Sequence, residues 1–120
     1  MYKKTYKRVK KMKNISRKFN IVIYEPHLLG NIKDLMRLLD KYGRYLYIRH
    51  TGENITPHYH IYYLSRNHTT PLLVKELFEE YIANRVFVDT TDLERENLIE
   101  YFLCGGEYSL SDIVSTLTLK

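Results

Sequence analysis

The chain has 120 residues, of which 44% are hydrophobic and 28% are charged, a composition typical of one globular domain without an appended motor or ATPase domain. The single cysteine, Cys104, excludes an internal disulfide. The sequence shows neither a secretion signal nor an apolar run near the roughly 20 residues that span a bilayer. These features favour a cytoplasmic protein with no membrane partner. The net charge of +5 is uneven, because nine of the 19 Lys and Arg residues lie in residues 1–18, leaving ten against 14 acidic residues in the remainder.

The first segment, residues 1–17, is a basic arm that we expect to be flexible, and residues 18–120 are expected to form the globular domain. No acidic residue interrupts the arm. This charge run favours a polyanion partner, because each neutralised phosphate releases condensed counterions. A solubilising tail and a targeting signal are the alternative interpretations. The candidate DNA-binding residues are Lys3, Lys4, Lys7, Arg8, Lys10, Lys11, Lys13, Arg17 and Lys18.

The domain begins with a predicted strand and a predicted helix. Residues 19–25 are β-branched and aromatic, and Pro26 ends the run, which is typical of a strand. Asn31 is a good N-cap, and Asp34 follows in a position like that of a capping box. Apolar residues then recur at helical spacing until Gly43. The pattern predicts a helix that ends there.

Two further strands and a second helix follow. Residues 44–51 and 58–65 alternate as strands do, and the short turn between them predicts an antiparallel hairpin. Thr70 then caps a helix that begins with Pro71. The apolar stripe of this helix extends it to residue 82. The members of the stripe are Leu73, Leu77, Phe78, Tyr81 and Ile82.

The last third of the chain adds a short strand, a third helix and a tail. The strand covers residues 86–89. Thr91 and Glu94 form a capping box, and the helix that they open runs to Cys104, where two glycines end it. The tail, residues 108–120, is compatible with a short helix or with an edge strand.

The predicted order is β-α-β-β-α-β followed by a helix, which gives an α+β fold class with the split βαβ, or ferredoxin-like, arrangement. This order predicts an antiparallel sheet whose first two helices cover one face. The opposite face of the sheet is then free to carry an active site.

Three of the five histidines cluster in eleven residues. His58 and His60 point to the same face of their strand because side chains alternate. The hairpin brings His50 alongside them, and Glu53 lies in the connecting turn. Three imidazoles and a carboxylate form a plausible site for a divalent cation. A pair of surface histidines is the alternative. The other two, His27 and His68, are expected to be exposed in loops.

Twelve tyrosines are present, and most are expected to pack with their hydroxyl groups at the surface. Tyr101 differs because it lies in the last turn of the third predicted helix, just before the glycine pair. A tyrosine there can project from a rigid helix toward the free face of the sheet. An ordinary packed tyrosine is the alternative interpretation.

Three strings in this order resemble the HUH superfamily of replication-initiator endonucleases. PHYHIYYLSRN (57–67) is similar to the HUH motif, in which one bulky apolar residue separates two histidines on a strand. RHTGE (49–53) resembles the segment that carries a further metal-binding histidine and a carboxylate. ENLIEYFLCGGEYSLSDI (96–113) resembles the tyrosine motif. The resemblance covers residues 19–113 and is greatest to the small initiators of rod-shaped archaeal viruses (rudiviruses).

The resemblance implies a metal site and a nucleophile. His58 and His60 would bind a divalent metal, Mg²⁺ or Mn²⁺, and His50 and Glu53 would complete the site. Imidazole ligands suit manganese or zinc better than magnesium, which prefers oxygen. Tyr101 aligns with the nucleophile of the family.

The chain departs from the family pattern next to this tyrosine. Many relatives have a lysine one turn later, where this chain has Cys104, so the role of that lysine in proton transfer is unassigned. Tyr108 is the alternative nucleophile, because a hinge at the glycine pair 105–106 would bring it into the site.

The implied function is initiation of DNA replication by site-specific nicking and joining of single-stranded or hairpin DNA. The intermediate would be a covalent 5′-phosphotyrosine, with a 3′ hydroxyl left as the primer. One nucleophile per chain favours a homodimer, working with host or viral replication machinery in the host cytoplasm if the protein is viral. The alternatives are a single-tyrosine transposase, distinguished by its DNA substrate, and a non-enzymatic DNA-binding regulator, which forms no covalent adduct.

Overall fold

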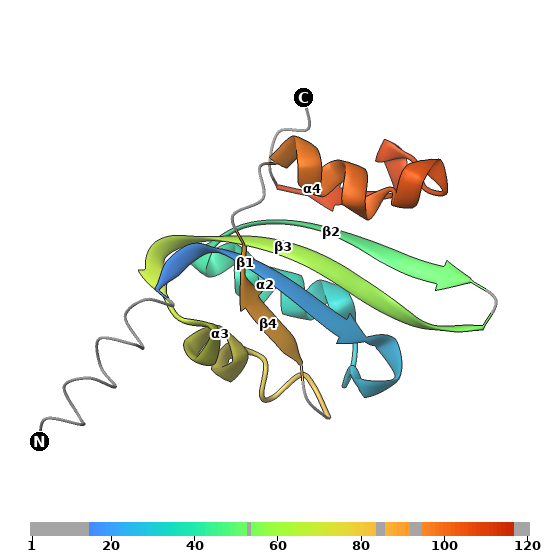
Figure 1. Cartoon of the computed structure of the whole chain (residues 1–120). Helices are drawn as coiled ribbons and strands as arrows, with labels where there is room; N and C mark the ends of the chain where they lie inside the picture. Colours follow the sequence, from blue (N-terminus) through green and yellow to red (C-terminus); the bar gives the residue numbers. More distant parts are fainter. Residues whose placement is uncertain (1–14, 53, 84–85, 92–94, 117–120) are drawn as a thin grey trace, which may run out of the picture.

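The computed structural model describes residues 15–52, 54–83, 86–91 and 95–116, and within them one antiparallel sheet lies between two layers of helices (Figure 1). The fold class is α+β, as predicted. The strands are β1 (Ser16–Tyr24), β2 (Gly43–Gly52), β3 (Ile55–Thr69), β4 (Phe87–Thr90) and β5 (Val114–Ser115). The helices are α2 (Ile32–Tyr42), α3 (Pro71–Leu77) and α4 (Arg95–Phe102).

The five strands follow the order β4-β1-β3-β2-β5, and adjacent strands are antiparallel. The hairpin of β2 and β3 is the centre of the arrangement, and its register places His50 opposite His58. The register shifts between His50 and Gly52. In the turn, Asn54 adopts φ of 63°, a left-handed conformation that asparagine tolerates. The predicted hairpin is therefore confirmed.

The main hydrophobic core lies between the sheet and the layer formed by α2 and α3. Alternation along each strand sends every second side chain into this core. The helices contribute the stripes that their 3.6-residue period places on one side. The fully or almost fully buried members include Phe19, Ile21, Ile23, Leu35, Leu39, Ile61, Val74 and Phe78.

A second, smaller core lies on the opposite face of the sheet, beneath α4 and the C-terminal segment (Figure 1). Its buried members are Leu46, Ile48, Tyr62, Phe102 and Ile113. The prediction that this face is wholly free was therefore wrong over β2 and β3. Toward β4 the same face stays open, and the side chain of Phe87 is 63% exposed there.

The predicted helix starts of α2 and α3 are confirmed by their capping hydrogen bonds. The Asn31 side chain accepts a hydrogen bond from the Lys33 N–H at 2.8 Å. The Thr70 hydroxyl accepts one from the Leu73 N–H at 3.3 Å. Each bond satisfies an N–H group that the first turn of a helix leaves without a partner. Among the described residues, no helix combines the length and the apolar character needed to cross a membrane.

The second helix is shorter than predicted, because α3 ends at Leu77 and not at Ile82. The following backbone bonds to the segment after β1 instead of continuing the helix. The Tyr81 carbonyl accepts from the Leu29 N–H at 2.7 Å, and the Ala83 N–H donates to the His27 carbonyl at 2.7 Å. The apolar stripe continues beyond the helix because these residues still pack into the core.

Other boundaries also differ from prediction, and β3, which covers Ile55–Thr69, is longer than the predicted strand over residues 58–65. β1 begins at Ser16, so Arg17 belongs to the sheet. α4 ends at Phe102, and a short 3-10 turn over Cys104–Gly106 follows; Glu94 of the predicted capping box lies outside the described residues. The tail forms both structures that were considered, a 3-10 turn at Leu110–Asp112 and the edge strand β5.

Candidate metal centre

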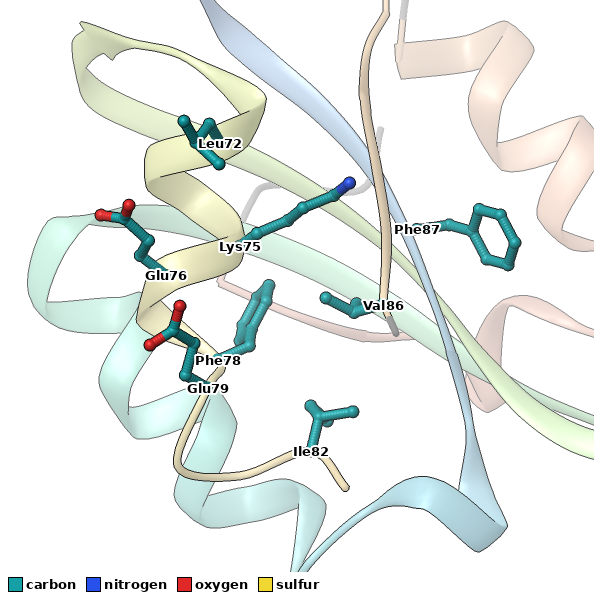
Figure 2. A pocket seen from close by; sticks show the side chains of 8 residues that line it. All are labelled: Leu72, Lys75, Glu76, Phe78, Glu79, Ile82, Val86 and Phe87. Atoms are coloured by element: carbon teal, nitrogen blue, oxygen red, sulfur yellow. The ribbon is translucent and has the colours of Figure 1, made fainter. Parts of the chain in front are cut away.

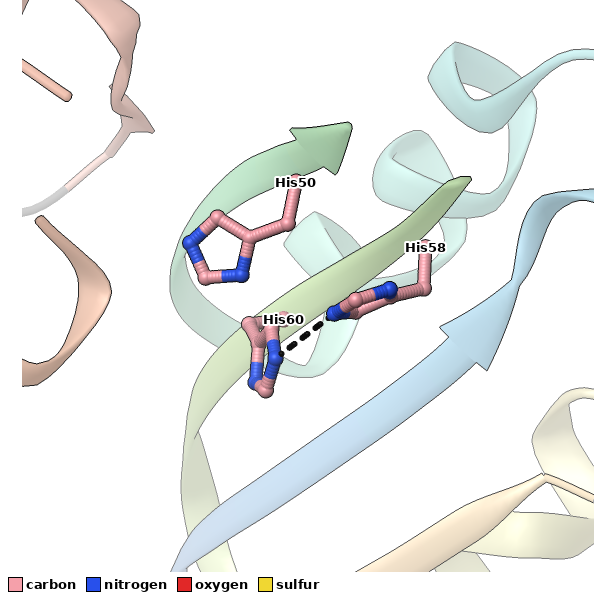
Figure 3. Close-up of side chains that lie close together, drawn as sticks. All are labelled: His50, His58 and His60. Atoms are coloured by element: carbon pink, nitrogen blue, oxygen red, sulfur yellow. Dashed lines mark hydrogen bonds between the residues drawn. The ribbon is translucent and has the colours of Figure 1, made fainter. Parts of the chain in front are cut away.

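Three histidine side chains converge on the face of the sheet that α4 partly covers (Figure 3). His50 comes from the end of β2, and His58 and His60 come from β3. One ligand atom from each residue can be chosen so that all three lie within 4.8 Å of one another. His50 is only 5% exposed, while the other two are half-buried. The described residues therefore contain a three-histidine group that could hold a metal ion.

Hydrogen bonds to backbone carbonyls orient two of the three rings. His50 Nε2 lies 2.7 Å from the carbonyl oxygen of Phe102, and His58 Nδ1 lies 2.8 Å from that of Thr56. A carbonyl only accepts, so each of these nitrogens carries the proton. The opposite nitrogen of each ring, Nδ1 of His50 and Nε2 of His58, keeps its lone pair. Such outer hydrogen bonds are typical of metal-binding histidines.

The third ring, His60, faces the second directly. The Nε2 atoms of His58 and His60 are 3.1 Å apart. Two nitrogens at about 2.0 Å from a tetrahedral ion lie about 3.3 Å apart, so the pair is spaced as two ligands of one ion are. His60 Nδ1 is buried without a hydrogen-bond partner among the described residues. The donor set fits a divalent cation that accepts imidazole ligands.

Electrostatics keep His60 in the form that binds metal. Burial, assisted by the neighbouring His50 and His58, lowers the pKa of His60 from 6.5 to about 4. Burial has this direction because it penalises the charged imidazolium more than the neutral ring. The His60 ring is therefore neutral near pH 7, and its lone pair is available to an ion.

Tyr101 lies beside the histidines on the last turn of α4. Its ring meets the His60 ring edge-on, with centroids 5.7 Å apart and planes at 82°. Its neighbour Phe102 is fully buried and anchors the helix end, while Tyr101 itself is 55% exposed. Both Tyr101 and the three histidines line one cavity of about 250 Å³. Tyr101 thus combines an exposed side chain with ring contacts to His60 and Phe102.

Tyr108 lines the same cavity but is held differently. Its ring packs against His50, with centroids 4.8 Å apart and planes at 38°. Its hydroxyl accepts a hydrogen bond from the Thr51 N–H at 2.9 Å and donates one to the Thr51 carbonyl at 2.8 Å. Both candidate tyrosines thus adjoin the histidine cluster, one with an exposed side chain and one with a hydroxyl bound to backbone.

Cys104 also adjoins the histidine centre. From the sequence it stood out only because relatives in the HUH superfamily have a lysine at this place after the tyrosine. Its Sγ lies 3.6 Å from His50 Nε2, the nitrogen bound to the Phe102 carbonyl. Burial and the Glu107 carboxylate raise the pKa of the thiol, so it is protonated near neutral pH. Cys104 adopts φ of 50°, a conformation more usual for the glycine that follows a helix. It packs against the outer side of His50.

The other predicted residues lie elsewhere in the fold or outside the part of the chain that the structure describes. Glu53 and the arm residues up to Lys13 lie outside the described residues. Arg17 and Lys18 lie in β1, where Arg17 Nε donates to the Ser65 carbonyl at 2.9 Å. His27 is half-buried, contrary to expectation, and its Nδ1 has no hydrogen-bond partner among the residues that the structure describes. His68 is exposed as predicted, although it belongs to β3.

The Phe102 and Thr56 carbonyls were not found from the sequence, because a backbone acceptor leaves no signature in residue type.

A larger cavity of about 460 Å³ lies between α3 and β4 (Figure 2). Its lining is mostly apolar, with Lys75, Glu76 and Glu79 at the surface and no histidine or tyrosine. Within the described part of the chain, the side chains that could hold a metal are therefore gathered at the histidine centre and not in this larger cavity.

Comparison of the chain with protein-family models and with curated proteins found no match.

Proposed function

We propose that the protein is a metal-dependent enzyme that nicks single-stranded DNA, of the replication-initiator type, on the ferredoxin-like fold of HUH endonucleases. The observation that carries the proposal is the placement of the exposed Tyr101 beside three convergent histidines in one cavity. The strand order β4-β1-β3-β2 supports the fold assignment. A metal site and a tyrosine on a rigid helix are the two groups that this reaction requires.

His50, His58 and His60 would hold the ion, and Mn²⁺ or Mg²⁺ are the proposed cofactors. When bound, the ion acts as a Lewis acid on a non-bridging oxygen of the scissile phosphate. The neutral imidazole of His60 and the two carbonyl-oriented rings supply the lone pairs. Three protein ligands leave coordination positions for the phosphate, which an open catalytic site needs.

In the covalent step, the Tyr101 hydroxyl oxygen bonds to phosphorus and the bond between phosphorus and the 3′ oxygen breaks. The tyrosine proton passes to solvent, and the departing 3′ oxygen takes a proton from solvent. The product is a 5′-phosphotyrosine with a free 3′ hydroxyl. Because the phosphoester is retained on Tyr101, a second 3′ hydroxyl can reverse the step and join strands.

The DNA strand would lie over the open part of the same sheet face. Phe87 and His60 both pair with Val22 in the strand register, on opposite sides of it. The exposed ring of Phe87 is therefore two strands from the metal centre and is available for stacking by an unpaired base. The basic arm would neutralise phosphates.

One tyrosine nucleophile per chain serves one strand at a time. Nicking followed by joining is simplest with two sites, so we propose that the protein acts as a homodimer with the replication machinery of its host or virus. A transposase of the same superfamily would show the same chemistry on a transposon end.

The deciding experiment is incubation of the protein with end-labelled single-stranded DNA and Mn²⁺, followed by a denaturing gel. We expect a protein–DNA adduct that resists SDS and is absent when EDTA is added first. DNA cleaved without attached protein would contradict the covalent step. Binding without cleavage, over a set of origin-like hairpins and transposon ends, would favour the non-enzymatic regulator.

A further inference from the structure

We propose that Tyr108 is a positioning residue that fastens the metal-binding hairpin to the end of α4. The inference deepens the proposed function and rests on it, because Tyr108 was the alternative nucleophile. It is carried by the contacts of the Tyr108 hydroxyl and ring, which point away from a role in attacking phosphorus.

The hydroxyl of Tyr108 takes the place of a strand partner at the outer edge of β2. It bonds to both the N–H and the carbonyl of Thr51, at 2.9 and 2.8 Å. Within the described residues, β5 pairs with Leu46 and Tyr47 and does not reach Thr51. The pairing of β2 with β3 also shifts just after His50. Tyr108 therefore binds the β2 backbone at Thr51, where the pairing of β2 with β5 is absent and its pairing with β3 is irregular.

The ring of Tyr108 supports the adjacent metal ligand. It packs on the His50 ring at 4.8 Å, while the Phe102 carbonyl holds His50 Nε2 at 2.7 Å. The Tyr108 N–H in turn donates to the Leu103 carbonyl at 3.1 Å. The end of β2 and the end of α4 are thus joined twice, once through His50 and once through Tyr108.

This double connection fixes the distance between the ion and the nucleophile. Tyr101 stands on the last turn of α4, and the residue after it supplies the carbonyl for His50. A hydroxyl that already donates and accepts within the backbone is not free to approach a phosphate. Among the described residues, no hydrogen bond restrains the hydroxyl of the exposed Tyr101 in this way. Tyr108 therefore positions both partners of the reaction and takes part in neither bond change.

Tyr108→Phe tests this role because it removes the two hydrogen bonds and keeps the ring. Mn²⁺ binding to the full chain is measured by calorimetry, and adduct formation is measured over a range of Mn²⁺ concentrations. We expect roughly tenfold weaker Mn²⁺ binding, the low end of the range for loss of an outer partner of a ligand, because the variant keeps the ring on His50 and the bond of His50 Nε2 to the Phe102 carbonyl. At saturating Mn²⁺ the adduct should still form, and peptide mapping should place it on Tyr101.

Tyr42→Phe is the matched control, since it removes the same atom from an exposed tyrosine on α2 in the other layer. Thermal unfolding of each ion-free variant separates an effect on the centre from a general loss of stability. A second measurement is a double-mutant cycle with His50→Ala. Once His50 is absent, Tyr108→Phe should weaken Mn²⁺ binding no further.

Two results would overturn the proposal. One is Mn²⁺ affinity of Tyr108→Phe equal to that of Tyr42→Phe. The other is loss of the adduct at saturating Mn²⁺ with affinity intact, which would make Tyr108 the nucleophile. If the unaltered protein forms no adduct but Tyr108→Phe still weakens Mn²⁺ binding through His50, the nicking function fails while the positioning role stands.

Discussion

The Nε2 atoms of His58 and His60 face each other at 3.1 Å, a distance at which two lone pairs repel unless something lies between them. In the ion-free protein a single shared proton can do so. A divalent cation satisfies both nitrogens together, and it leaves the outer hydrogen bonds of the other rings undisturbed. Because the His60 ring is neutral, an ion that takes the place of this proton requires the proton to move to His60 Nδ1, and no proton is released overall.

The first prediction concerns these two ligands. His58→Ala and His60→Ala should each weaken Mn²⁺ binding by more than the roughly 10–100-fold expected for an outer partner, because each change removes a ligand itself. Nicking should be lost with it. His68→Ala is the control, since His68 lies exposed on the same strand outside the cluster. Calorimetry with Mn²⁺ checks the effect, and normal binding by His58→Ala would show that the site is misplaced.

The second prediction concerns the nucleophile. Tyr101→Phe should abolish the SDS-resistant adduct while Mn²⁺ binding and DNA binding persist. Its side chain is 55% exposed, so the free energy of unfolding should change by no more than about 0.5 kcal/mol. A denaturing gel and urea titration measure the two effects. An adduct that survives this change would assign the attack to another tyrosine.

The third prediction concerns the basic arm. Deleting residues 1–14 removes seven Lys and Arg residues and leaves β1 intact, because that strand begins at Ser16. DNA binding should weaken, and its dependence on salt should become shallower by about 0.7 in the logarithmic slope for each lost contact to single-stranded DNA. Filter binding at several salt concentrations measures this slope. Replacing the same residues by glutamine separates charge from length, and an unchanged slope would return the arm to a solubilising role.

The fourth prediction concerns packing at the start of β2. A Cβ on Gly43 would lie 2.1 Å from the Leu64 carbonyl oxygen, too close for any real contact. Gly43→Ala should therefore cost about 1–3 kcal/mol of stability, as overpacking of a well-filled interior does. Gly30→Ala is the comparison, because its φ of 106° is strained but no atom lies within 4 Å of the added carbon. Equal urea midpoints for Gly43→Ala and the unaltered chain would contradict this packing.

The sequence predicted those features that depend on periodicity and caps. Alternation placed His58 and His60 on one face, and the turn after His50 brought the third ring beside them. The Asn31 and Thr70 caps identified two helix starts. These signals are local, so a single sequence contains them.

The features that the sequence did not predict depend on contacts between backbone groups that are far apart in the chain. After α3 the chain bonds to residues 27–29, because the Tyr81 carbonyl accepts from the Leu29 N–H and the Ala83 N–H donates to the His27 carbonyl. An apolar stripe does not reveal these bonds. The hydrogen bond between His50 and the Phe102 carbonyl joins residues that are 52 positions apart in the chain. It does not depend on the type of side chain at position 102. The approach of α4 to the sheet covered part of a face that strand alternation alone had left open.

All three histidines of the proposed metal centre belong to one hairpin, within the eleven residues from His50 to His60. Closing so short a loop costs little chain entropy, so ion capture needs only local pairing of β2 with β3. Contacts of low sequence separation form early in folding, whereas α4 follows β3 by some 26 residues. An ion present during synthesis would therefore stabilise this hairpin before α4, which carries the proposed nucleophile, is in place, and metal supply would influence the yield of folded protein as well as the proposed activity.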